Sequence, residues 1–144
     1  DLPYIISDVI QSKALDEKIK IENYSFSIAK GLKPVASIRL RINDNSYEDR
    51  SEGDGQYDAV MKTIKKIYDR LGKSLPQLIN YKVSIPPGGK TDALVQTIIT
   101  WQNEKEFKTK GLDSDQTVSA IKATMKMLNI IDGNILQNKI ANTN

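Results

Sequence analysis

Hydrophobic and polar residues alternate in two segments near the start of the chain. After one slip in the alternation, the apolar positions of residues 21–30 are Ile21, Tyr24, Phe26 and Ile28. In residues 34–42 the apolar positions are Ala36, Ile38, Leu40 and Ile42. A period of two residues is typical of a half-buried β-strand, and Gly31 between the segments favours a turn. The pattern therefore predicts a β-hairpin.

The next segments predict a third strand and then a helix. Residues 43–46, with the sequence NDNS, have the composition of a turn, and the polar run 47–52 is predicted to be a strand. Apolar residues then recur at helical spacing, at Ala59, Val60, Ile64, Ile67 and Leu71. Gly72 follows the last of them and supplies a helix stop.

The same succession then starts again. Strands are predicted for residues 79–85, 93–101 and 103–111, followed by a helix over 113–129. Its predicted apolar face contains Val118, Ile121, Met125 and Leu128. The matching positions lie 58 residues apart and are Gly31 and Gly89, Gly53 and Gly111, Val60 and Val118, and Ile67 and Met125. The sequence therefore predicts an α+β fold of two pseudo-symmetric βββα units with helices packed on antiparallel sheets; the alternative is chance similarity between two ordinary βββα stretches.

This pattern also divides the chain. The two repeats span about residues 19–73 and 77–130, within one domain over 19–130. Residues 1–18 are expected to form a linker helix from a preceding region, and residues 131–144 a frayed tail. The apolar start is too short for a secretory or membrane segment, and the chain begins at Asp1, so it is interpreted as a piece of a longer protein.

Composition narrows the possible chemistry. The sequence contains no His and no Cys, so it offers no imidazole base, thiolate nucleophile or common transition-metal ligand. We therefore expect no catalytic residue and no metal site in this chain. The net charge is +3, but basic residues are interspersed with acids, which is typical of solvated faces. A basic stripe with interleaved aromatics is missing, which disfavours a nucleic-acid partner.

Three segments carry candidate chemistry. GDGQYDAV at 53–60 leads two glycines into a helix start, where unpaired N–H groups favour an anion such as a carboxylate; the alternative is that Asp58 caps the helix. GLDSDQTV at 111–118 is interpreted as capping by its acids. PPGGKTDAL at 86–94 lacks phosphate-loop spacing and is interpreted as a hairpin turn. The flanking aromatic and aliphatic cluster, with core as its alternative, is Tyr81, Val83, Ile85 and Val95.

The chain resembles the C-terminal regulatory domain of the 2-isopropylmalate and citramalate synthase family. The resemblance is carried by GDGQYDAVMKTIKKI, LINYKVSIPPGGKTDALVQTIITW and KTKGLDSDQTVSAIKATMKMLN, and it covers residues 20–130. It implies a homodimer whose amino-acid end product binds at or near the interface between regulatory domains. It also implies a separate, cytoplasmic N-terminal catalytic barrel, which holds a divalent metal and joins acetyl-CoA to a 2-oxo acid.

The resemblance also implies an effector site. Tyr57 and Asp58 would lie at the polar end of the amino acid, with Thr91 nearby. Its side chain would be surrounded by Leu78, Tyr81, Ile85 and Val95. The chain departs from the family pattern at Tyr57, where many members have a smaller aliphatic residue, and at Asp113, where they often have Gly.

Isoleucine and citramalate synthase are the first choice, and leucine and 2-isopropylmalate synthase the alternative. One misplaced methylene is worth only ~1 to 3 kcal/mol in a hydrophobic pocket, so the residues leave this choice open. The alternatives from other classes are a dimerisation module without a ligand and a small stand-alone enzyme, for which no catalytic base is found. No membrane partner and no cofactor in this fragment are expected.

Overall fold

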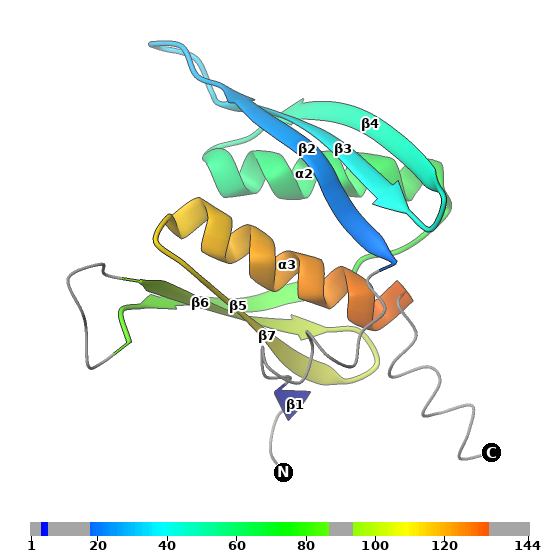
Figure 1. Cartoon of the computed structure of the whole chain (residues 1–144), viewed down its shortest axis with the longest axis vertical. Helices are drawn as coiled ribbons and strands as arrows, with labels where there is room; N and C mark the ends of the chain where they lie inside the picture. Colours follow the sequence, from blue (N-terminus) through cyan, green and yellow to red (C-terminus); the bar gives the residue numbers. More distant parts are fainter. Residues whose placement is uncertain (1–3, 6–17, 87–93, 133–144) are drawn as a thin grey trace. The chain divides into compact units, whose positions relative to one another are not determined.

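The computed structural model describes residues 4–5, 18–86 and 94–132 (Figure 1). The chain divides into two compact units, Lys18–Leu75 and a second that combines Asp1–Glu17 with Pro76–Asn144. Three antiparallel strands followed by a helix recur in both units. The predicted α+β fold of two βββα units is therefore confirmed.

The first unit is a three-stranded sheet with β3 in the centre. Its elements are β2 (Ile19–Ser27), β3 (Val35–Ile42), β4 (Asn45–Glu52) and α2 (Gln56–Arg70). The slip in the hydrophobic alternation is a β-bulge between Ile21 and Asn23. The polar run predicted as a third strand does pair with β3, and the turn between them places Asn43 at a φ of 55°.

The core of this unit follows from the two periodicities of the sequence. The buried side chains of β3 are Ala36, Ile38, Leu40 and Ile42, while Arg39 and Arg41 between them are exposed. In α2 the buried residues are Ala59, Val60, Thr63, Ile64, Ile67 and Tyr68. The hydroxyl of Thr63 donates to the carbonyl oxygen of Ala59 at 2.7 Å. Gly72, with a φ of 69°, ends the helix as predicted, because the N–H groups of Gly72 and Lys73 bond back to Asp69 and Tyr68.

The second unit adds a strand from the beginning of the chain. Its elements are β5 (Gln77–Ser84), β6 (Val95–Gln102), β7 (Glu106–Asp113), α3 (Gln116–Asp132) and β1 (Tyr4–Ile5). The strand order is β1-β7-β6-β5, and β1 runs parallel to β7. Tyr4 and Ile5 are therefore a strand and not part of the helix expected over 1–18. The other residues below 18, and the tail beyond 132, lie outside the described residues.

Helix α3 buries a different face from the one predicted. Its buried residues include Ser119, Ala120, Ala123, Thr124, Met127 and Leu128. Val118 and Met125, expected in the apolar face, are only partly buried. Small and hydroxyl-bearing residues allow the helix to approach the sheet closely, and the hydroxyl of Thr109 on β7 donates to the carbonyl oxygen of Ala123 at 2.7 Å.

The two units correspond to each other with an offset of 60 residues, and not 58. Helices α2 and α3 begin at Gln56 and Gln116, and strands β3 and β6 at Val35 and Val95. A helix lysine donates to a strand carbonyl at the same offset in each unit, Lys66 to Arg50 at 2.8 Å and Lys126 to Lys110 at 2.6 Å. Burial lowers the pKa of Lys126 to about 8.

Candidate functional site

The start of α2 is formed by a close approach between the preceding loop and the helix backbone. A Cβ atom on Gly53 would lie 2.3 Å from the nitrogen of Ala59, so the expected need for glycine at this close approach is confirmed. Neither Gly53 nor Gly55 has a positive φ, which corrects the expectation of left-handed backbone there. Gly55 is the N-cap residue and makes no side-chain cap hydrogen bond. The helix therefore begins without the side-chain oxygen that usually serves its first N–H groups.

Asp58, in the first turn of α2, closes the preceding loop. Its carboxylate accepts a hydrogen bond from the N–H of Asp54 at 2.8 Å, and it lies 3.2 Å from the ammonium of Lys62. The Asp54 N–H holds the pKa of Asp58 below its ordinary value, and Lys62 acts in the same direction. The carboxylate side chain is 42% exposed, and Tyr57 beside it is half-buried. Asp58 is thus a charged, accessible group whose printed backbone contact is to the loop.

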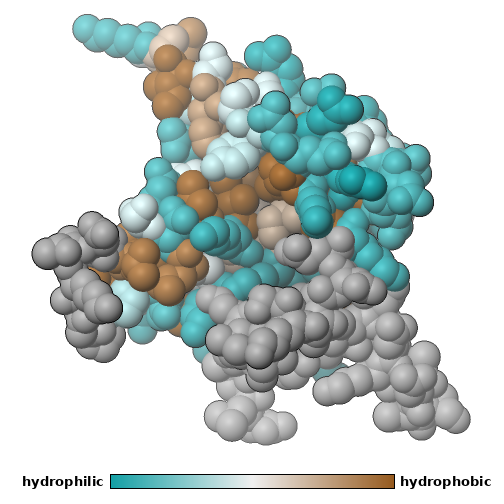
Figure 2. Space-filling model, viewed as in Figure 1, coloured by the Kyte–Doolittle hydropathy of each residue, from teal (hydrophilic) through white to brown (hydrophobic). Residues whose placement is uncertain are grey.

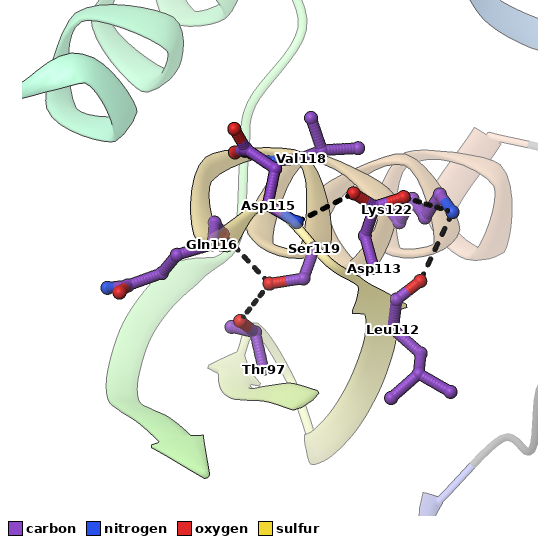
Figure 3. A network of polar contacts seen from close by, with 8 residues as sticks. All are labelled: Thr97, Leu112, Asp113, Asp115, Gln116, Val118, Ser119 and Lys122. Carbon is purple, nitrogen blue, oxygen red and sulfur yellow. Dashed lines mark hydrogen bonds and ion pairs between the residues drawn. The ribbon is translucent and has the colours of Figure 1, made fainter. Parts of the chain in front are cut away.

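The start of α3 is capped in the usual way, as predicted (Figure 3). Asp115 accepts a hydrogen bond from the N–H of Val118 at 3.0 Å. Asp113 accepts one from the N–H of Asp115 at 2.9 Å and pairs with Lys122 at 3.0 Å. The Asp115 N–H lowers the pKa of Asp113, and the bond with Lys122 adds to this shift. These carboxylates are occupied in holding the helix start, in contrast to the N-cap of α2.

Four of the predicted effector residues belong to the β5–β6 hairpin. Leu78 and Tyr81 pair with Trp101 and Ile99 in the ladder, and both partners are fully buried. The strand period puts Leu78, Tyr81, Val95 and Thr97 on one face, and Thr97 joins that face to α3 through Ser119. Leu78 is 38% exposed and Ile85, which follows β5, is 67% exposed. Figure 2 shows hydrophobic surface at the open end of this hairpin. The cluster is therefore an exposed apolar face, and the alternative of ordinary core does not hold for Ile85.

The hydroxyl of Tyr81 is not free on this face. It makes hydrogen bonds with the side chains of Gln116 and Thr97, and burial raises its pKa. Sequence reasoning missed this connection because Thr97, Gln116 and Ser119 are polar residues without a motif. Alternation along β6 does place Thr97 beside Tyr81, which is the one signal that was present.

The predicted site residues fall into two groups. Tyr57 and Asp58 belong to the first unit, while Leu78, Tyr81, Ile85 and Val95 belong to the second. Thr91 lies outside the described residues. Within the described parts of the chain, no group of three or more His, Cys, Asp or Glu side chains is arranged to hold a metal ion. Among the same residues, no helix has both the length and the apolar character needed to cross a membrane.

A separate hollow lies on the sheet of the first unit. Its volume is about 450 Å³, and residues of all three strands line it, among them Ser25, Ser37, Arg39, Glu48 and Arg50. The ladder places Ser25, Ser37 and Arg50 in one row across the sheet. None of the predicted effector residues lines this hollow.

Comparison with known proteins shows relatives of one kind. A putative (R)-citramalate synthase from Archaeoglobus fulgidus is 26% identical over 91% of this chain and 26% of its own length. A 2-isopropylmalate synthase from Heliobacterium modesticaldum is 29% identical over 92% of this chain and 25% of its own. The (R)-citramalate synthase of Methanocaldococcus jannaschii is 26% identical, over 91% and 26%. The chain thus spans about a quarter of the length of the curated relatives it matches.

A family model matches nearly the whole chain. The matched residues are 1–131, and the family is described as the LeuA allosteric (dimerisation) domain. The match agrees with the fold of two βββα units and with the resemblance found in the sequence. It also includes the segment before residue 19 that contains β1. The chain belongs to the LeuA allosteric (dimerisation) domain family.

Proposed function

We propose that this chain is the amino-acid sensor of a citramalate synthase and binds isoleucine for end-product feedback inhibition. The relatives include citramalate synthases and 2-isopropylmalate synthases at similar identity, so leucine sensing in a 2-isopropylmalate synthase is the alternative. The family description supports an allosteric, homodimeric domain. We assign catalysis, and the divalent metal that serves it, to an N-terminal catalytic domain of the parent protein and not to this chain.

The observation that carries this proposal is the start of α2. Its N-cap residue, Gly55, makes no side-chain cap hydrogen bond, and the positive end of the helix dipole favours a carboxylate there. Asp58 adds an exposed negative charge within the same turn, which suits an ammonium group. An α-amino acid carries both groups on one carbon. The start of α3, where Asp115 supplies the cap, has no such opening.

The exposed apolar face of the β5–β6 hairpin suits a branched alkyl side chain. We assign Leu78, Tyr81, Ile85 and Val95 to the side chain of the effector. The hydroxyl of Tyr81 is already engaged by Gln116 and Thr97, so its ring contributes shape. Thr91 stays a predicted contact to the polar end, and Tyr57 a predicted neighbour of the effector.

Calorimetric titration of the chain with isoleucine, leucine and valine tests the proposal. We expect saturable heat with isoleucine, weaker binding of leucine, and weaker binding again of valine. The rival function is a dimerisation module without a ligand. It requires no saturable heat with any of the three amino acids, and that result would remove the sensor proposal.

The substitution Val95→Ala is expected to reduce selectivity. It should weaken isoleucine binding by ~1 to 3 kcal/mol and narrow the advantage over leucine, because an enlarged cavity no longer penalises a displaced methyl group. Val35→Ala is the matched control, since Val35 begins β3 as Val95 begins β6 and both are partly buried. Equal losses in the two variants, measured by the same titration, would argue against a role of Val95 in recognition.

A further inference from the structure

A buried polar cluster connects the apolar face of the β5–β6 hairpin to the first turn of α3. The hydroxyl oxygens of Thr97 and Ser119 are 2.6 Å apart, and both residues are fully buried. The Ser119 hydroxyl lies 2.8 Å from the carbonyl oxygen of Gln116 (Figure 3). Tyr81, which is half-buried, adds hydrogen bonds to the side chains of Gln116 and Thr97. Four side chains from β5, β6 and α3 therefore meet at one place.

The position of each proton in this cluster follows from one group that cannot donate. The carbonyl oxygen of Gln116 only accepts, so Ser119 must donate its single hydroxyl proton to it. Thr97 then has to donate to Ser119. With that proton used, Thr97 can only accept from Tyr81, and Tyr81 in turn accepts from the amide of Gln116. The hydrogen bonds form a closed circuit that starts and ends at Gln116.

We propose that Thr97, Ser119 and Gln116 are positioning residues that hold the Tyr81 ring in the orientation that distinguishes isoleucine from leucine. The inference rests on the proposed function, because it assigns a role to the surroundings of a predicted effector residue. In the closed circuit the Tyr81 hydroxyl has no proton left to give to a ligand. Tyr81 recognises the effector by the place of its ring, and the circuit sets that place.

A second polar chain in the same unit provides a contrast. The indole N–H of Trp101 donates to Thr109 at 2.9 Å, and Thr109 donates to the carbonyl oxygen of Ala123. This chain also joins the sheet to α3, but Trp101 at its end is fully buried. It therefore stabilises the core, whereas the circuit ends on a ring that belongs to a partly exposed apolar face.

Titration of hydroxyl variants with isoleucine and with leucine tests the proposal. Thr97→Val keeps the shape and removes the hydroxyl, so we expect a roughly 3- to 10-fold weaker isoleucine affinity, the range of one hydrogen bond, and a smaller ratio to leucine. Thr97→Ser should restore most of both. The control is Thr100→Val, a buried threonine on the same strand but on the opposite face, which should leave the ratio unchanged. An unchanged ratio in Thr97→Val overturns the proposal.

Thermal unfolding of Tyr81→Phe, Thr97→Val and the double variant tests the circuit without any ligand. Residues that share one hydrogen-bond network are coupled, so the double variant should lose less in Tm than the two single losses together. Additive losses would show that the two hydroxyls act separately and would overturn the circuit. If the unmodified chain shows no saturable heat with either amino acid, the proposed function fails, while coupled losses would still support the circuit.

Discussion

Replacement of Asp58 by Ala is expected to weaken isoleucine binding far more than it destabilises the fold. Loss of the charge facing a bound ammonium group should cost on the order of 2 to 5 kcal/mol of affinity. Loss of the hydrogen bond from the N–H of Asp54, a contact comparable to a helix cap, should cost only ~0.5 to 2 kcal/mol of stability. Calorimetry and urea unfolding of the same variant measure the two effects.

Asp58→Asn separates the charge from the hydrogen bond, because the amide oxygen still accepts from Asp54. It should lose affinity like Asp58→Ala and keep most of the stability. Asp69→Ala is the control, since Asp69 is exposed on the same helix and pairs with Lys65 at 3.0 Å. Unchanged affinity in Asp58→Asn would leave Asp58 a structural residue only.

The lowered pKa of Asp58 gives this comparison a pH dependence. An ionised Asp that is stabilised in the fold contributes stability above its unfolded pKa of about 3.9. That contribution is lost as the pH falls through the lower, folded pKa. The stability difference between the unmodified chain and Asp58→Asn should therefore be constant near neutral pH and shrink in acid.

Replacement of Gly111 by Ala is expected to destabilise the second unit by about 3 kcal/mol or more, at the upper end of the cost of overpacking. A Cβ atom there would lie 1.9 Å from the carbonyl oxygen of Ser119 and 2.8 Å from the nitrogen of Ala123. Both are backbone atoms of α3, so no side chain can move away and the helix itself must shift. Denaturant unfolding followed by the fluorescence of Trp101, the single Trp of the chain, reports on the same unit.

Gly55→Ala is the matched control for this substitution. A Cβ atom on Gly55 meets nothing within 4 Å, and its φ of −148° is open to any residue. We expect a change within ~0.5 kcal/mol, as for a surface position. Similar losses in the two variants would mean that glycine at 111 is required for a reason other than the contact between β7 and α3.

Hydrophobic periodicity predicted the elements whose buried residues are conventionally apolar. The alternation in β3 and the helical spacing in α2 were correct, and even the slip before Tyr24 has a structural counterpart in the bulge at Ile21–Asn23. For α3 it predicted the wrong face, because the buried side chains Ser119, Ala123 and Thr124 do not count as apolar in such a pattern. The same error produced the offset of 58 residues, since glycines were aligned in place of buried small residues.

The predicted site was recovered unevenly for a related reason. Strand alternation was enough to place Leu78, Tyr81 and Val95 on one face of the second sheet. The bond between Asp58 and the N–H of Asp54 depends on the path of a loop, which composition does not define. The circuit around Tyr81 depends on contacts between β5, β6 and α3, and no spacing along the chain marks such contacts in advance.

The parallel pairing of β1 with β7 gives the chain an order of assembly during translation. Strands β2 to β4 and helix α2 occupy Lys18–Leu75 without interruption, so a ribosome can release them as a complete folding unit. Tyr4 and Ile5 leave the exit tunnel earlier still, but their partners Phe107 and Lys108 are synthesised about a hundred residues later. The first strand to emerge is thus among the last to find its place, and the nascent chain carries it across one finished unit before the second can close.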